Sequence, residues 1–413
     1  KAHSISISPG TLEAISYFHR IVRCACLLHD VGHSSFSHQF NRTSTIKTAL
    51  AKEGRFEQLW ENSEYQDIYQ SKPSPLEHEH FSVRAAYEIL SDITEDGLDL
   101  AILDILSLME TTDIVPSQQF EQHAAEIWPL IAQRPSEQDR SPKDLSTPKE
   151  ASSLTETMPE QFAKKLQHVL ASIVSGELDA DRADYMLRDG FHSSVTIGGF
   201  NLDHLLSNLH FGWCSQTKWF GLAISEKGLS SLEDFVYSRH QMYRQVYAHK
   251  TAQGFDWLLR AAIDEVMQQP HILKFVDQCL SDIYKFKHLT DSYFWEAFRQ
   301  YADTHTNSYS NCILERNKMR YITTRENLSA EEEQHYLSFL AKEHQTEQLV
   351  ASSITARFTK IKEGFTDMKV LVSDHQHQKP TLRSISNTSR FFDKFTDEKI
   401  THFYLNPVIQ ENS

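Results

Sequence analysis

Residues 28–38 read LHDVGHSSFSH, and this stretch decides which kind of fold and chemistry the chain can have. It contains three histidines, His29, His33 and His38, and one aspartate, Asp30. Imidazole and carboxylate groups together suit a divalent metal such as iron, manganese, nickel, cobalt or zinc. In a chain with 22 histidines a His-Asp pair occurs about once by chance, so the specificity lies in the whole string. For any single member, a polar helix end whose histidines cap carbonyl groups is the alternative.

An apolar pattern leads into this stretch. Its members recur at helical spacing, which predicts a helix that ends at the His-Asp pair. They are Ile15, Phe18, Val22, Ala25 and Leu28. Similar patterns cover residues 81–90, 98–109, 162–174, 232–249 and 255–267. Residues 1–290 therefore indicate a helical bundle.

Two polar stretches interrupt this bundle, and its C-terminal side has another character. Residues 41–77 suggest an insertion, and residues 135–160, rich in Pro, Ser and charge, suggest a mobile loop. A helical pattern continues to about residue 359, and then 368–372 and 402–405 look like short strands. We expect a mostly α protein in which 291–413 form a C-terminal helical region that ends in a small α+β segment.

The composition sets limits on function. Of 413 residues, 40% are hydrophobic and 11% aromatic, so the chain can bury a core. A net charge of −15 argues against a general nucleic-acid coat or a polybasic membrane binder. A polyanion would need a local basic site or a metal. The five scattered cysteines favour reduced thiols, and no apolar run reaches the roughly 18 residues of a membrane span. We expect a soluble cytoplasmic protein that does not bind membranes.

The second candidate cluster is EHEHFSV, residues 77–83. His78 stands beside Glu79, and a carboxylate that orients an imidazole is what general acid–base catalysis requires. The alternative is a hydrated helix N-terminus, where glutamate is common.

The third cluster is SGELDADRADYMLRD, residues 175–189. On a helix, Asp181, Tyr185 and Arg188 share one face, and Asp189 lies beside it. A carboxylate and an arginine on one stripe fit a metal ligand next to an anion-binding group. The alternative is a salt-bridged solvent face.

The fourth cluster is YSRHQMYRQVYAHK, residues 237–250. Arg239, Tyr243, Tyr247 and Lys250 fall at i, i+4, i+8 and i+11, which predicts one continuous helical face. Two cations interleaved with two aromatic rings suit a phosphate tail and a packed ring. The alternative is an amphipathic helix whose tyrosines are half-buried core residues.

In this order, HDVGHSSFSH, HEHFSV, GELDADRADYMLRDG and RHQMYRQVYAHK resemble the HD-domain phosphohydrolases. The resemblance is strongest to the bacterial deoxynucleoside triphosphate triphosphohydrolase branch, which is related to the mammalian SAM- and HD-domain enzyme. It covers roughly residues 15–259. It implies an HD-domain helical bundle that hydrolyses dNTPs to deoxynucleoside and inorganic triphosphate. It also implies a homodimer or homotetramer, with an allosteric nucleotide.

The resemblance implies one divalent metal (Fe, Mn, Ni, Co, Zn or Mg), with a second Mg on the substrate phosphates. The metal ligands would be His29, Asp30 and Asp181, and neither Asp179 nor Asp184. The residues that match the family's catalytic histidines and their carboxylate partner are His33, His38, His78 and Glu79.

The resemblance also assigns substrate contacts. Arg182 would meet the triphosphate, and Tyr185 and Asp189 the deoxyribose 3′-hydroxyl. Arg239 would contact phosphate, and Tyr247 would crowd C2′ and so disfavour ribonucleotides. On the same predicted face, Tyr243 and Lys250 complete the candidate substrate site.

One departure from the family concerns its first histidine, which normally lies around forty residues before the His-Asp pair. His3 resembles it superficially but stands only 26 residues before His29, so we expect this ligand upstream of Lys1. Two alternatives follow. One is another HD-type nucleotide phosphohydrolase or phosphodiesterase, and the other is a nucleotide-sensing protein with a degenerate HD site.

Overall fold

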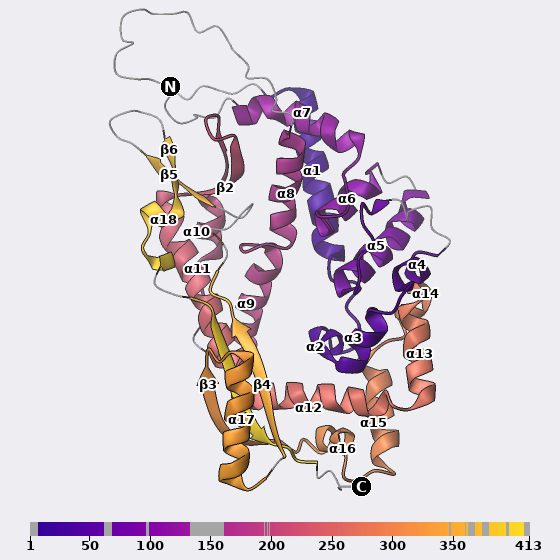
Figure 1. Cartoon of the computed structure of the whole chain (residues 1–413). Helices are drawn as coiled ribbons and strands as arrows, with labels where there is room; N and C mark the ends of the chain where they lie inside the picture. The colour runs from indigo at the N-terminus through magenta and orange to yellow at the C-terminus, as the bar shows by residue number, and fades with distance from the viewer. Residues whose placement is uncertain are drawn as a thin grey trace, which may run out of the picture. The chain divides into compact units, whose positions relative to one another are not determined.

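The computed structural model describes residues 7–61, 68–95, 99–132, 161–193, 195, 197, 199–346, 348–359, 361, 368–373, 380–393 and 396–408. Helices dominate these residues, and the strands form two small sheets (Figure 1). The mostly α fold with a small α+β C-terminal region is thereby confirmed. Within the described residues, no helix has both the length and the apolar character that crossing a membrane requires. His3 and the predicted loop 135–160 lie outside the described residues.

The chain folds into two compact units, each built from three segments. The first unit comprises residues 1–29, 89–239 and 359–395, and the second comprises residues 30–88, 240–358 and 396–413. Three of the five boundaries fall at the His29–Asp30 peptide bond, within helix α5 (His78–Glu95) and within helix α11 (Leu229–Met242), and the other two lie at 358/359 and 395/396. The sequence division into 1–290 and 291–413 stays a prediction about domain organisation.

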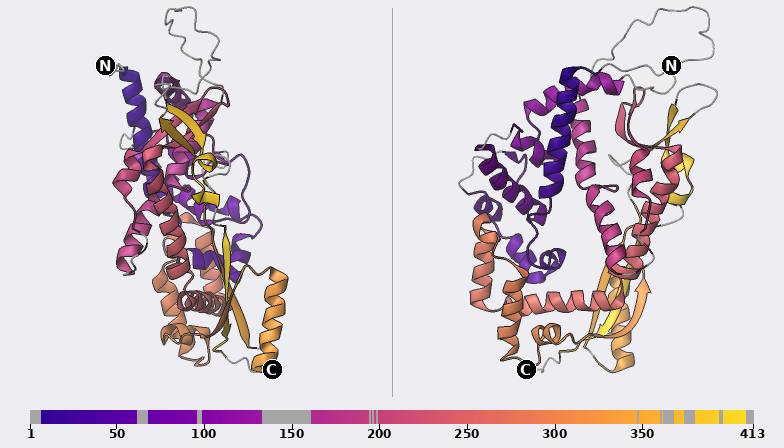
Figure 2. Two further views of the ribbon diagram at one scale, coloured as in Figure 1. Left: turned by 90° about the vertical axis from the view of Figure 1, so that its left-hand side faces the viewer. Right: turned by 180° about the vertical axis from the view of Figure 1, so that it is seen from behind.

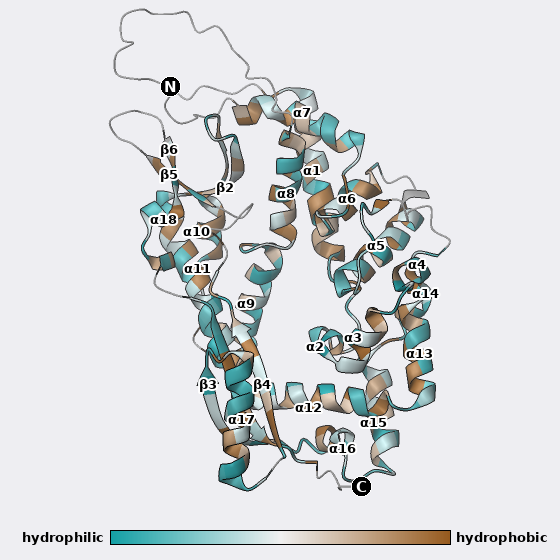
Figure 3. Cartoon of the chain, viewed as in Figure 1, coloured by the Kyte–Doolittle hydropathy of each residue, from teal (hydrophilic) through white to brown (hydrophobic). Residues whose placement is uncertain are grey.

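The first unit contains a helical layer. Its helices are α1 (Pro9–Leu28), α6 (Ile102–Met109), α7 (Gln118–Ala132), α8 (Phe162–Val174), α9 (Ala180–His192), α10 (Leu202–Ser207), η2 (Glu226–Gly228), α11, α18 (Ile385–Thr388) and η5 (Phe391–Asp393). Helix α1 packs against α6, α7 and α8 (Figures 1 and 2). The short helix α6 is apolar along most of its length (Figure 3) and is largely buried.

Helix α1 begins where the sequence provides a start. The Ser8 hydroxyl accepts a hydrogen bond from the Thr11 amide at 3.0 Å, and Pro9 occupies the first turn. The buried face differs in part from the predicted stripe, because Ile15 is 41% exposed. The face turned to the core carries Ala14, Tyr17, Phe18, Ile21 and Ala25.

A sheet in the first unit corrects the prediction of an uninterrupted helical bundle. Its order is β1 (Leu209–Cys214), β2 (Trp219–Ser225), β5 (Lys369–Ser373) and β6 (Pro380–Ser384). The β1–β2 and β5–β6 pairs are antiparallel, and β2–β5 is parallel. Residues 209–225 are rich in aromatic residues, which favour strands, and the Trp219 ring lies over Gly221, where a Cβ would approach it to 2.6 Å.

The second unit is built around one long helix. Its helices are α2 (His38–Arg42), α3 (Ser44–Leu50), α4 (Arg55–Leu59), the start of α5, the π-helix η3 (Tyr243–Tyr247), α12 (Lys250–Val266), α13 (Pro270–Leu280), α14 (Ile283–Phe286), α15 (Asp291–Ala302), α16 (Tyr309–Leu314) and α17 (Ala330–His344). Helix α12 packs against α2, α3, α15 and α16. The predicted insertion 41–77 contains α3 and α4.

A second sheet, with order β3 (Arg320–Glu326), β7 (Glu398–Leu405) and β4 (Leu349–Ala356), is antiparallel throughout. The helical pattern predicted to residue 359 is therefore wrong at β3 and β4, since pairing with a distant strand overrides local propensity. The predicted strands 368–372 and 402–405 correspond to β5 and β7. Helix α17 lies alongside this sheet (Figure 2), and its surface is largely hydrophilic (Figure 3).

Candidate functional site

Three histidines meet in the second unit. Ligand atoms of His33, His38 and His78 lie within 4.8 Å of one another. The rings of His33 and His78 are stacked, with centroids 3.9 Å apart and planes at 18°, and the His38 ring meets His78 edge-on at 5.1 Å. The His33 Nε2 atom lies 3.6 Å from the Asp30 Oδ1 atom. Two segments about forty residues apart in the chain thus form one imidazole cluster.

A close backbone approach fixes the spacing of these segments. The Gly32 amide donates a hydrogen bond to the Ser82 hydroxyl at 2.9 Å, at the start of α5. A Cβ on Gly32 would lie 2.1 Å from the Ser82 backbone nitrogen and 2.5 Å from the His78 carbonyl oxygen. Only glycine allows this approach, which places His33 beside His78.

The segment between α1 and α2, residues 29–37, is called here the histidine loop, and aromatic packing anchors its C-terminal end. Phe36 and Ser37 adopt positive φ angles of 56° and 52°, a backbone conformation that non-glycine residues rarely adopt. The Phe36 ring stacks on Phe298 at 6.3 Å, and its amide donates to the Asp291 carboxylate at 2.8 Å. The surrounding contacts therefore maintain a strained turn, which directs His38 into α2.

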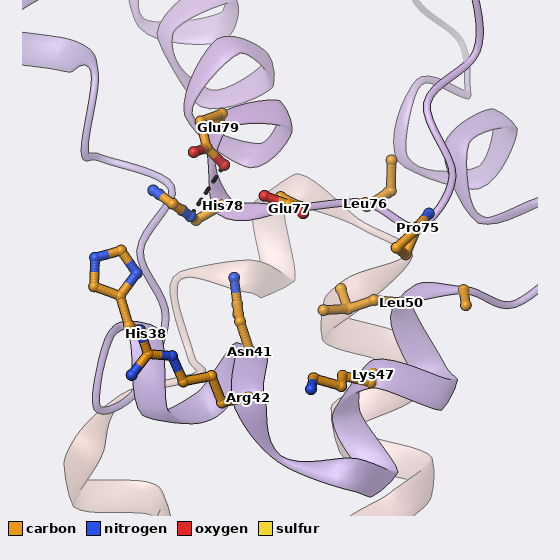
Figure 4. Close-up of a pocket in the computed structure, with 11 residues that line it drawn as sticks. His38, Asn41, Arg42, Lys47, Leu50, Pro75, Leu76, Glu77, His78 and Glu79 are labelled. Carbon is orange, nitrogen blue, oxygen red and sulfur yellow. Dashed lines mark ion pairs between the residues drawn. The ribbon is translucent and has the colours of Figure 1, made fainter. Parts of the chain in front are cut away.

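His78 is oriented by its neighbour. The His78 Nδ1 atom lies 3.0 Å from the Glu79 Oε2 atom, as Figure 4 shows. A carboxylate at Nδ1 leaves Nε2 as the nitrogen that can exchange a proton. His38, His78 and Glu79 line a pocket of about 590 Å³. The structure thus brings together all four predicted catalytic residues, and their catalytic roles stay a prediction.

The predicted metal ligands start at the end of α1. His29 follows this helix, and its Nδ1 atom lies 2.9 Å from the Cys26 carbonyl oxygen, so Nε2 is left to bind a metal. His29 and Asp181, both in the first unit, offer ligand atoms within 4.8 Å of each other. Asp30 follows His29 directly in the chain and is the first residue of the second unit. An imidazole and carboxylates are a donor set that fits iron, manganese or zinc.

The two neighbouring aspartates have other roles. Asp179 is buried and caps α9, accepting hydrogen bonds from the Arg182 amide at 2.7 Å and the Gly176 amide at 2.8 Å. Burial raises the pKa of the Asp179 carboxyl, although Arg182 opposes this shift. Asp184 forms an exposed ion pair with Arg188 at 2.5 Å. Of the three carboxylates, Asp181 is the one that lies with His29.

Glu177, to which the sequence analysis gives no role, forms ion pairs with two arginines that are predicted to contact the substrate. The Glu177 carboxylate lies 3.1 Å from the Arg182 Nη1 atom and 3.2 Å from the Arg239 Nη1 atom. Burial lowers the pKa of Arg182, but the carboxylates of Asp179 and Glu177 outweigh this effect and raise it. Glu177 stands in the string GELDADR, but a glutamate within a run of charged residues does not indicate which cationic side chains it will contact.

Tyr185 and Asp189 lie on α9, the helix that also carries Asp181 and Arg182, and both side chains are half-buried. Their positions agree with the predicted helical face. The structure leaves the proposed contact with a deoxyribose as a prediction.

The predicted continuous face from Arg239 to Lys250 is wrong. The α-helix ends at Met242, a π-turn covers residues 243–247, and α12 begins only at Lys250. A π-turn has more residues per turn than an α-helix, so the i, i+4, i+8 register is lost. The rings of Tyr243 and Tyr247 remain neighbours at 5.0 Å, and the Lys250 ammonium lies 4.6 Å from the Tyr321 ring centroid.

No family model matches the chain. An uncharacterized protein of Methanocaldococcus jannaschii is 33% identical over 103 residues, which are 24% of this chain and 22% of that protein. The uncharacterized protein YwfO of Bacillus subtilis is 30% identical over 99 residues, again 24% of this chain and 22% of that protein. The matched segment thus spans about a fifth of the length of these relatives.

Two solved structures resemble nearly the whole chain. A hypothetical protein from Aquifex aeolicus superposes with a TM-score of 0.58 at 19% identity, over 96% of this chain and 80% of that one. A phosphohydrolase from Bacteroides thetaiotaomicron superposes with a TM-score of 0.53 at 17% identity, over 98% of this chain and 82% of that one. The fold is shared with a phosphohydrolase. At these identities the likeness concerns the fold alone.

Proposed function

We propose that this chain is a metal-dependent phosphohydrolase that acts on nucleotides, and that its substrates are dNTPs cleaved to deoxynucleoside and inorganic triphosphate. The observation that carries the proposal is the imidazole cluster of His33, His38 and His78, with Glu79 behind His78, on the wall of a pocket. The fold shared with a phosphohydrolase and the ordered resemblance to the HD-domain motifs support it.

The metal would be held by His29, Asp30 and Asp181. The hydrogen-bond geometry at His29 and the separation of Asp181 from its two neighbouring aspartates support this choice. When bound, a divalent metal polarises a phosphoryl oxygen and lowers the pKa of bound water.

The chain's own residues would position and protonate the substrate. The Glu79 carboxylate lies 3.0 Å from the His78 Nδ1 atom and would orient the ring, so that His78 can hold a proton at Nε2 for the leaving oxygen. His38 stands edge-on to His78 and is the second candidate for general acid, since both line the same pocket. Ser37 lies 3.2 Å from the His33 Nδ1 atom and would fix the orientation of that ring.

Substrate recognition is proposed for two groups of residues. Arg182 and Arg239 would contact phosphate, while Tyr185 and Asp189 would meet the sugar. Tyr243, Tyr247 and Lys250 would form the other group, with Tyr247 near C2′ of the sugar. Ion pairing with Glu177 holds both arginine side chains in place before substrate binds. The arginines then lose less conformational entropy on substrate binding.

Product analysis tests this proposal. The purified chain is incubated with each dNTP and NTP, with and without added divalent metals, and the products are separated. Attack at the phosphorus next to the sugar yields inorganic triphosphate and a deoxynucleoside. Orthophosphate or pyrophosphate as first product would indicate a different HD-type phosphohydrolase. Nucleotide binding without turnover would indicate a sensor.

A further inference from the structure

The π-turn η3 and the start of α12 are held by side chains that the proposed mechanism does not use. The hydrogen bond from the Ala248 amide to the Tyr243 carbonyl, at 2.7 Å, joins residues five positions apart and defines the π-turn. Because this spacing differs from that of an α-helix, the place of the Tyr247 ring relative to Tyr243 depends on whether the π-turn persists. A helix that ends also leaves its last carbonyl groups to donors outside the helix. The side chains that supply these donors therefore decide where Tyr247 lies.

Gln253, on α12, supplies the first donor. Its Nε2 atom donates to the Tyr247 carbonyl at 2.9 Å and to the Asp256 carboxylate at 3.3 Å. Its Oε1 atom accepts a hydrogen bond from the Ser352 hydroxyl on β4 at 3.4 Å. The Gln253 side chain is buried, with 4% of its surface exposed. These contacts fix the orientation of the amide, so the backbone of Tyr247 is bound to a fixed point on α12.

His402, on β7, supplies the second donor. Its Nε2 atom lies 2.8 Å from the Ala248 carbonyl oxygen, and because a carbonyl oxygen can only accept, Nε2 carries the proton. The Nδ1 atom of the same ring lies 2.7 Å from the Thr324 hydroxyl, which donates to it. Burial lowers the pKa of His402 and so favours the neutral ring that this arrangement requires. The His402 ring thus binds the end of the π-turn to the sheet.

The first residue of α12 is held by the same sheet. The Tyr404 hydroxyl on β7 donates to the Lys250 carbonyl at 2.6 Å, and the Lys250 ammonium lies 4.6 Å from the Tyr321 ring centroid. The N-terminal end of α12 therefore lies beside the sheet of β3, β7 and β4 (Figure 1). All of these residues belong to the second unit, so the π-turn and its supports form part of one compact body.

We propose that Gln253 and His402 are positioning residues for sugar recognition, which hold the backbone of Tyr247 and Ala248 so that the Tyr247 ring stands where it excludes a 2′-hydroxyl group. The inference rests on the proposed function, because it concerns the residue that is placed near C2′ of the sugar there. Neither Gln253 nor His402 contacts the nucleotide. Both act through the π-turn, so loss of either donor should let the ring move and admit ribonucleotides more readily.

Calorimetric titration of the full chain as purified, with non-hydrolysable analogues of a dNTP and of the matching NTP, tests the inference without turnover. The wild-type chain should bind the deoxynucleotide analogue more tightly. Gln253→Met keeps the length of the side chain without a donor, and His402→Leu removes the donor from β7. Each should narrow the ratio of the two dissociation constants about fivefold, which is less than removal of the Tyr247 ring should. Unfolded chain lowers the stoichiometry of both titrations equally, so this ratio separates positioning from lost stability.

Three further variants make the test specific. His402→Gln retains an Nε2 donor and should keep the wild-type ratio. Gln245→Met is the matched control, because it makes the same substitution at an exposed position of the π-turn, where Gln245 donates to the Gln241 side chain, and it should leave the ratio unchanged. Adding Gln253→Met to Tyr247→Ala should narrow the ratio no further, because a residue that acts through a ring has no effect once the ring is absent.

An unchanged ratio in Gln253→Met or in His402→Leu would overturn the inference, even if both analogues bound more weakly. Equal binding of the two analogues by the wild-type chain would do the same, as would further narrowing in the double variant. If the wild-type chain hydrolyses dNTPs but the ratios do not change, the inference fails and the proposed function stands. If the ratios narrow as expected and the wild-type chain hydrolyses no nucleotide with any metal, the proposed function fails and the positioning roles stand.

Discussion

Gly32→Ala is the single substitution whose effect follows most directly from the structure. The new Cβ would lie 2.1 Å from the Ser82 backbone nitrogen, whereas real Cβ contacts are at least 3.0 Å. The histidine loop and the start of α5 must therefore separate by about 0.9 Å. Because the neighbouring atoms belong to the backbone, rotation of a side chain cannot relieve the clash. The stacked rings of His33 and His78 lie on the two segments that must move apart.

The size of the effect has two parts. Overpacking of this kind costs about 1–3 kcal/mol. Loss of the hydrogen bond from the Gly32 amide to the buried Ser82 hydroxyl adds about 1 kcal/mol. We expect the free energy of unfolding to fall by about 2–4 kcal/mol. A displacement of about 1 Å at catalytic groups lowers turnover about 100-fold, so the proposed phosphohydrolase activity should fall much more than the folded fraction.

Denaturant unfolding and steady-state hydrolysis, measured on the same preparations, check both parts. Gly199→Ala is the matched control, since a Cβ at Gly199 would meet nothing within 4 Å and should change neither quantity. If Gly32→Ala keeps its stability within about 0.5 kcal/mol of wild type and its full activity, the close approach does not position the histidines.

Three other predictions concern the metal, the sugar and pH. Asp181→Ala should abolish metal retention measured by elemental analysis, whereas Asp184→Ala, which removes only an exposed ion pair, should retain the metal. Tyr247→Ala should narrow the dNTP-over-NTP preference in kcat/KM about tenfold, and an unchanged ratio would return Tyr247 to a packing role. Burial lowers the pKa of His402 from 6.5, so the folded chain binds fewer protons there than the unfolded chain does. The free energy of unfolding should then fall as the pH drops through and below 6.5, by up to about 1.4 kcal/mol per pH unit, and His402→Gln should lack this part of the pH dependence.

Local sequence was sufficient for several features because their physical causes are local. The pattern over residues 162–174 predicted α8 with the bounds that the structure has. The prediction of Asp181 rested on a motif, and the structure gives Asp179 a capping role and Asp184 an ion pair with its helix neighbour. Both contacts join residues within four positions of each other, which is the range over which a helix brings side chains together.

Local pattern failed where a distant segment decided the conformation. Residues 320–326 and 349–356 form strands because β7, from the end of the chain, lies between them and supplies their hydrogen-bond partners. The face expected from Arg239 to Lys250 assumed an uninterrupted α-helix, but a π-turn and a helix end intervene. Backbone pairing and helix irregularities depend on tertiary packing, which periodicity does not include.

The sequence by itself determined which chemical groups are available: the imidazoles, the carboxylates and the cations of four ordered motifs. Tertiary structure alone decided how they are combined. The absence of a Cβ at Gly32 lets His33 stack on His78, and Glu177 forms ion pairs with two arginines that are 57 positions apart in the chain. The same packing places Arg42 and Lys47 on one wall of a pocket with His38 and His78. The packing of the helices sets the distances between groups that are far apart in the chain. These distances decide which groups interact, because the interaction of a charge or an imidazole with its neighbour weakens as their separation grows.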